Sequence, residues 1–128
     1  MNREIKFRGK RIDTGEWVYG LLMANFDNKY SIQVRCDFDD IKYFISHKVI
    51  PETIGEFTGL KDKNGKEIYE DDIVEWEDTI DYEMYGGDNI QIKEGVRFEG
   101  GCFYPICMMS EEEYEIIDNI CENPELIN

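Results

Sequence analysis

Carboxylates that stand close together near the middle of the sequence are the first residues that could do chemistry. Asp71, Asp72 and Glu75 could hold a magnesium ion as a nuclease does, with Tyr69 and Trp76 as the wall of a pocket. An acidic corner beside a strand is usually just solvated, however, and nucleases surround their metal with basic residues that hold the phosphate. We therefore expect no metal site here.

Other possible metal ligands are also poorly arranged. The acidic run from Asp37 to Asp40 lacks the glycine and the distal glutamate of a calcium-binding loop, so we expect a polar loop. Zinc sites use ligands paired at short spacing, whereas the cysteines are scattered and the sole histidine, His47, lies far from them. We expect buried, reduced thiols at Cys36, Cys102, Cys107 and Cys121.

No catalytic motif stands out elsewhere in the chain. The sequence contains no identifiable serine, cysteine and histidine set, no phosphate-cradling glycine loop and no H-E-x-x-H motif. We expect neither catalysis nor a cofactor, so the function to look for is binding.

Alternating apolar and polar residues, separated by turn signals, indicate strands along most of the chain. The clearest turn is Asp62-Lys63-Asn64-Gly65, where Gly65 can take a positive φ angle. We predict a mainly β fold with little helix, made of two small antiparallel β units. They are an N-terminal unit over residues 1–55 and an acidic C-terminal unit over residues 56–128, the second one SH3-like or barrel-like.

The stretch from Thr53 to Glu70, TIGEFTGLKDKNGKEIYE, resembles the signature of the YopX family, small proteins encoded by phages and prophages of bacteria. Ile5 to Arg8 and Asn119 to Leu126 are similar to that family's opening strand and closing motif, so the resemblance spans nearly the whole chain. The family pattern usually has glycine where Asp71 and Asp118 stand here. The resemblance implies an all-β architecture, a phage context and no assigned activity or catalytic residues.

Charge is distributed unevenly along the chain. Residues 1–70 carry 12 basic and 12 acidic side chains, whereas residues 71–128 carry 2 basic and 17 acidic ones, so the whole net charge of −15 lies in the second part. A strongly negative surface repels phosphate backbones and attracts basic partners. We therefore expect a basic host or phage protein as the partner, and we consider nucleic acid unlikely.

The segment from Glu77 to Asn89 is rich in acids and amides, and we expect it to be a long mobile loop that binds protein. Its acidic residues would steer a basic partner, and its tyrosines would anchor the contact. The candidate protein-binding residues are Asp78, Asp81, Tyr82, Glu83, Tyr85 and Asp88.

The basic residues near the N-terminus support two alternative functions. Alternation over residues 3–11 predicts a half-buried strand at the edge of a sheet, whose lysines prevent edge pairing. The strand could instead bind nucleic acid as a small regulator, or it could contact the acidic part of another copy in a homo-oligomer that is only structural. The candidate residues for both alternatives are Arg3, Lys6, Arg8, Lys10 and Arg11.

The sequence contains no apolar run near the length of a membrane span and no charged-then-apolar leader. We therefore expect a cytoplasmic protein of the bacterial host with no membrane partner.

Overall fold

The structure of this chain, a computed structural model, describes residues 4–25, 27, 29–82, 86–106 and 113–127. It is mainly β and contains several small antiparallel sheets, which confirms the predicted fold class. The chain divides into two compact units, residues 1–59 and residues 60–128, which are described separately.

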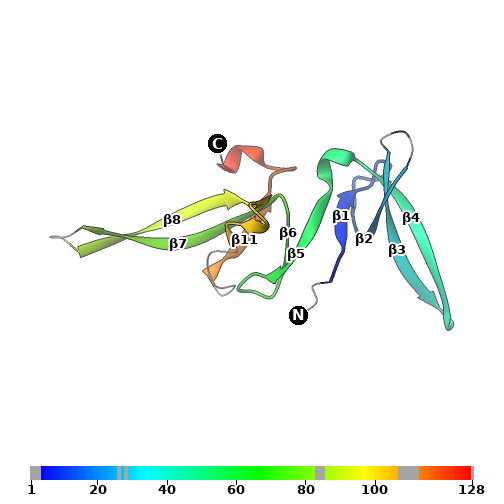
Figure 1. Cartoon of the computed structure of the whole chain (residues 1–128), viewed down its shortest axis with the longest axis horizontal. Helices are drawn as coiled ribbons and strands as arrows, with labels where there is room; N and C mark the ends of the chain where they lie inside the picture. Colours follow the sequence, from blue (N-terminus) through cyan, green and yellow to red (C-terminus); the bar gives the residue numbers. More distant parts are fainter. Residues whose placement is uncertain (1–3, 26, 28, 83–85, 107–112, 128) are drawn as a thin grey trace. The chain divides into compact units, whose positions relative to one another are not determined.

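Four strands of the first unit form a meander, and a fifth strand pairs with the first strand of that meander. They are β1 (Phe7–Lys10), β2 (Trp17–Ala24), β3 (Tyr30–Phe38), β4 (Ile41–Val49) and β5 (Gly55–Lys61), with the 3₁₀ turn η1 (Pro51–Thr53) before β5. Their order is β4-β3-β2-β1-β5, and neighbours are antiparallel (Figure 1). The prediction that the N-terminal strand lies at an edge is therefore wrong, because β1 has β2 on one side and β5 on the other.

The sheet of the first unit curls until the end of β1 meets the end of β4. Arg11 forms a bridge with Val49, and the Ile12 N–H donates to the Lys48 carbonyl oxygen at 3.0 Å. Within this sheet β2 and β3 approach each other closely at Gly20, where a side-chain carbon would lie 2.0 Å from the Gln33 carbonyl oxygen. Only glycine fits this position.

The fully buried residues of the first unit are few. Ile32 and Val49 are the most buried apolar residues. The Thr53 hydroxyl accepts from the Lys10 N–H at 2.9 Å and donates to the Ile50 carbonyl at 2.6 Å, so it links β1 to the turn after β4. A buried hydroxyl with both bonds made avoids the cost of an unsatisfied polar group.

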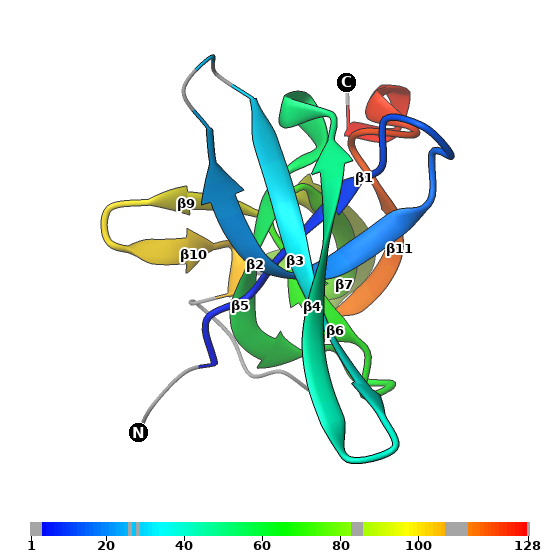
Figure 2. The same ribbon diagram turned by 90° about the vertical axis from the view of Figure 1, so that its right-hand side faces the viewer.

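The second unit contains a three-stranded sheet and a separate hairpin. Its elements are β6 (Glu67–Tyr69), β7 (Asp72–Tyr82), β8 (Gly86–Gly95), β9 (Arg97–Glu99), β10 (Cys102–Tyr104), β11 (Glu115–Asn119) and the 3₁₀ turn η4 (Pro124–Ile127). The sheet has the order β11-β7-β8. The hairpin is formed by β9 and β10 (Figure 2). One core cluster holds these elements together, and its buried members are Ile68, Val74, Trp76, Val96, Phe103, Ile106 and Tyr114.

The turn predicted at Asp62 to Gly65 is present, and its first residue organises the second unit. Gly65 has a φ of 82°. The buried Asp62 carboxylate accepts from the N–H groups of Asn64 and Lys66, both at 2.9 Å, and from that of Ile116 in β11 at 3.0 Å. One side chain therefore closes the turn and attaches it to a strand far along the chain.

The two aspartates that stand where the family usually has glycine behave differently. Asp71 has a φ of 72°, as expected from a glycine position, and Asp tolerates this conformation better than most residues. Asp118 does not have a positive φ. It lies where the pairing of β11 with β7 is irregular, and its carboxylate accepts from the Asn119 N–H and from the side chain of Asn123.

We predict that Gly20→Ala destabilises the first unit by at least ~2 kcal/mol, because the added methyl group would force β2 away from β3. Gly15→Ala is the matched control: nothing lies within 4 Å of its added carbon, so only the strain of its φ of 74° remains, about 1 kcal/mol. Thermal unfolding followed by circular dichroism measures both. Equal effects would contradict the close approach at Gly20.

We predict that Asp62→Asn destabilises the protein by about 1–3 kcal/mol, because an amide cannot accept all three N–H groups. Burial acts to raise the pKa of Asp62, but the N–H groups of Ile116, Lys66 and Asn64 outweigh it and hold this pKa below its usual value. The ionised carboxylate therefore contributes its full stabilisation above the unfolded-state pKa of about 3.9. This stabilisation is lost as the pH falls through the lower pKa of the folded state.

Urea unfolding from pH 6 down to the acid range tests this assignment. The difference in stability between the wild type and Asp62→Asn should shrink as the pH falls through that window. A difference that stays constant with pH would show that the carboxylate charge is not involved.

Candidate binding surfaces

A hollow of about 280 Å³ in the second unit is lined mainly by acidic side chains, and we call it the acidic hollow. Its glutamates come from β7, from the residue before Tyr114 and from β11. The lining residues are Lys63, Glu75, Trp76, Glu77, Gln91, Glu113 and Glu115.

Backbone pairing explains why the glutamates gather. Glu75 lies opposite Glu115 across the β7–β11 ladder, and Glu77 follows two residues later on the same face of β7. Lys63 lies 3.4 Å from Glu115, and both side chains are about half exposed, so this pair contributes little. Lys93 stands opposite Glu75 in β8. Acids still outnumber bases, and the hollow is suited to a cationic group.

The predicted long loop from Glu77 to Asn89 is wrong, because most of this segment belongs to two paired strands. β7 and β8 run antiparallel from Ile73 opposite Gly95 to Tyr82 opposite Gly86, and they form a ribbon (Figure 1). Glu83 and Tyr85 lie outside the described residues. Of the other predicted protein-binding residues, Asp78, Asp81, Tyr82 and Asp88, the structure describes the backbone, which is part of this ladder.

The acidic corner considered for magnesium has a structural use instead. The Asp72 carboxylate is buried and accepts from the Tyr69 N–H at 2.8 Å, and the Asp71 N–H donates to the Val96 carbonyl. Within the described part of the chain, no group of three or more histidine, cysteine, aspartate or glutamate residues could hold a metal ion. Cys36, Cys102 and Cys121 are half-buried, less buried than we expected, and Cys107 lies outside the described residues.

The basic residues near the N-terminus contact aromatic rings and acids of their own unit. The Arg8 guanidinium lies 4.7 Å and the Lys10 amino group 5.4 Å from the centre of the Trp17 ring. Lys6 lies 4.9 Å from the centre of the Phe57 ring. Electrostatic attraction favours a cation over an aromatic face, and Arg8 is also almost completely buried.

Arg11 is paired with an acid two residues later in the chain. Two of its nitrogens donate to the two Asp13 carboxylate oxygens, at 2.9 and 2.7 Å. This pairing is the main reason that the pKa of Asp13 is lowered. Arg3, the remaining predicted basic residue, lies outside the described residues.

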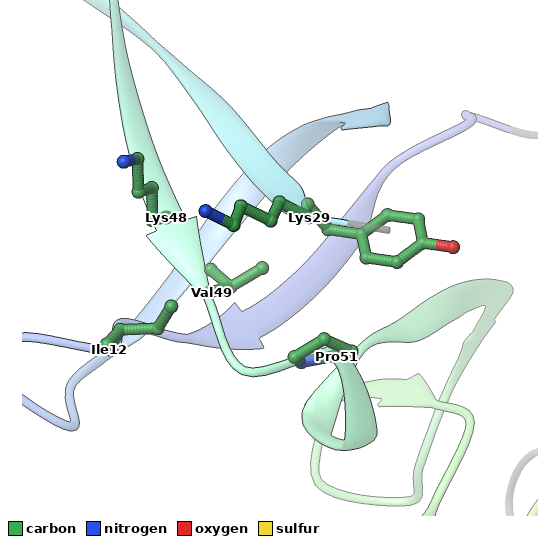
Figure 3. A pocket seen from close by; sticks show the side chains of 6 residues that line it. Ile12, Lys29, Lys48, Val49 and Pro51 are labelled. Carbon is green, nitrogen blue, oxygen red and sulfur yellow. The ribbon is translucent and has the colours of Figure 1, made fainter. Parts of the chain in front are cut away.

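The first unit has a hollow of about 280 Å³ that the sequence did not indicate. Ile12, Val49 and Pro51 form its apolar part, and the Lys29 side chain extends from the start of β3 toward Lys48 on β4 (Figure 3). The residues that line it come from segments far apart in the sequence. No local motif marks them, so this hollow can be identified only once the pairing of the strands is known.

None of the described helices is long and apolar enough to cross a membrane.

Comparisons with known proteins give a family and a fold. A search of curated proteins finds no match. Among solved structures, the crystal structure of protein EF1440 from Enterococcus faecalis is similar, with a TM-score of 0.62 and 22% identity, and the match covers 99% of this chain and 100% of that chain. At this identity the likeness shows the fold alone. The family model described as YopX protein matches residues 6–128, so the chain belongs to the YopX family.

Proposed function

We propose that this protein is a non-enzymatic protein-interaction module whose acidic second unit binds a basic protein of the phage or its host. The observation that best supports the proposal is the acidic hollow, which is lined by four glutamates from three segments of the chain and by one lysine. A lysine or arginine side chain of a partner would find carboxylates on several sides there. Charge-assisted hydrogen bonds of this kind are stronger than neutral ones.

The net negative charge of residues 71–128 also favours a basic partner. With 17 acidic and 2 basic residues after residue 70, this region attracts a basic partner from a distance and raises the rate of encounter. We include in the proposed contact the predicted residues Asp78, Asp81, Tyr82 and Asp88, whose backbone belongs to the β7–β8 ladder.

The alternative of a nucleic-acid-binding regulator has less support. Its candidate cations would have to leave contacts that they already make: Arg8 and Lys10 lie over Trp17, and Arg11 forms two hydrogen bonds to Asp13. The net charge also opposes a phosphate backbone.

We predict that the double variant Glu75→Gln with Glu77→Gln binds an arginine-rich peptide about tenfold more weakly than the wild type, a loss of ~1.4 kcal/mol. Fluorescence anisotropy of the labelled peptide at low and moderate salt measures the affinity. Binding by the wild type should weaken with salt, because attraction between exposed charges is screened.

The control is Asp27→Asn with Glu125→Gln, which changes the net charge equally at two exposed acids outside the hollow. A third variant, Asp78→Asn with Asp81→Asn and Asp88→Asn, tests the ribbon separately. Equal losses in the control and the hollow variant would leave only a non-specific charge effect and refute the hollow as the site. Tight binding of bare DNA together with no binding of the peptide would favour the regulator.

A further inference from the structure

Strand β4 lies at the end of the first unit's sheet, and over most of its length no described residue pairs with one of its two edges. β3 pairs with it from Val49 opposite Tyr30 to Ile41 opposite Phe38. On the other edge, the described residues make backbone contacts only near the end of β4, where Ile12 donates to Lys48 and Ile50 donates to Lys10.

The geometry of a strand determines which backbone groups point to the open edge. The N–H and C=O of one residue point to the same side, and successive residues alternate between the two sides. The Lys48 carbonyl and the Ile50 N–H both form their bonds across the outer edge. The backbone groups of Lys42, Phe44 and Ser46 must therefore point to that edge as well.

This edge lacks the features that usually prevent strands from joining. Proteins protect open edges with prolines, bulges, short strands or rows of charge. β4 has nine residues, no proline and an uninterrupted register with β3, and Lys42 is the only charged residue between Ile41 and His47. Its large apolar side chains are exposed: Ile41 by 65%, Tyr43 by 42%, Phe44 by 57% and Ile45 by 40%.

We propose that β4 pairs with β4 of a second copy, antiparallel about a two-fold axis at Phe44, so that two first units share one continuous sheet. In this register Phe44 faces Phe44 and Lys42 faces Ser46. All three residues that point to the edge then exchange both of their backbone hydrogen bonds with the partner. Addition of a strand to an open edge is a common mode of recognition.

Charge selects this register over its neighbours. Lys48 already bonds to Ile12 at this edge, so the shared ladder ends at Ser46, and Asp40 of the second copy comes close to Lys48 just beyond each end. A shift by two residues in one direction brings Lys42 to the edge position at Lys48, which Ile12 already occupies, and also brings two like charges together. A shift in the other direction brings Ser46 opposite Asp40, which lies in the turn after β3 with a φ of 66°, and leaves part of the edge unpaired.

A hollow at the end of the edge would receive the tip of the partner's hairpin. It has a volume of about 350 Å³ and is lined by Arg11, Ile12, Asp13, Ser46, His47 and Lys48. In the proposed register the partner's turn at Asp39 and Asp40 reaches this end of β4. Arg11 is already paired with Asp13, so Lys48 is the cation that the partner's acids would meet.

Charged residues at position 44 test the two-fold axis directly. Sedimentation equilibrium of the wild type should show a dimer. Phe44→Glu and Phe44→Lys should each raise the dimer dissociation constant at least about tenfold, since each brings like charges face to face. An equimolar mixture of the two variants should associate again, because opposite charges then face each other.

The control variant is Phe98→Glu, which replaces an aromatic residue that is 55% exposed in the second unit and should leave the dimer intact. Circular dichroism melting of every variant confirms that it is folded. A monomeric wild type, an unchanged mass for Phe44→Glu, or a mixture that stays monomeric would each overturn the proposal. The acidic hollow lies in the second unit, so the peptide measurements above are independent of this result.

Discussion

The Asp62 carboxylate is the interaction on which the second unit most depends. A turn and a strand that are more than fifty residues apart both donate backbone N–H groups to it. The adjacent Lys63 N–H donates to the Tyr114 carbonyl, which strengthens the same connection. Buried N–H groups without acceptors are costly, and the Asp62 carboxylate provides the acceptors for three of them.

Charges have different structural uses in the two parts of the chain. In the first unit, Arg8 and Lys10 of β1 lie against Trp17, and Lys6 just before β1 lies against Phe57, so these side chains contribute packing as well as charge. In the second unit, Asp62 and Asp72 are buried and accept backbone N–H groups, whereas the glutamates of the acidic hollow have no such use. In the second unit, therefore, the buried acids serve the turns, and the glutamates of the acidic hollow are the ones that we propose for contacts with other molecules.

Local chemistry made part of this fold predictable. The strand class, the turn at Gly65 and the positive φ of Asp71 each depend on a few consecutive residues. The neighbours of a strand depend on distant residues, and for this reason the position of β1 inside the sheet was not predicted. The acidic content of residues 77–89 indicated a loop, but strand pairing over a long register outweighed the low β-propensity of its acids.

The candidate sites divide in the same way. Acidic candidates for binding a basic partner could be named from charge alone, whereas the gathering of Glu75, Glu113 and Glu115 around one hollow required the ladder between β7 and β11. The sequence did not indicate the open edge of β4, because composition alone does not distinguish an edge strand from an internal strand.

The bond from Ile12 to Lys48 also limits how far the sheet of the first unit can grow. It occupies the last edge group of β4, so the free ladder has a defined end. A two-fold pairing of β4 uses the same surface on both copies and leaves no second open β4 for another chain. Growth through this edge therefore terminates at a closed pair, and a fibre cannot propagate from it.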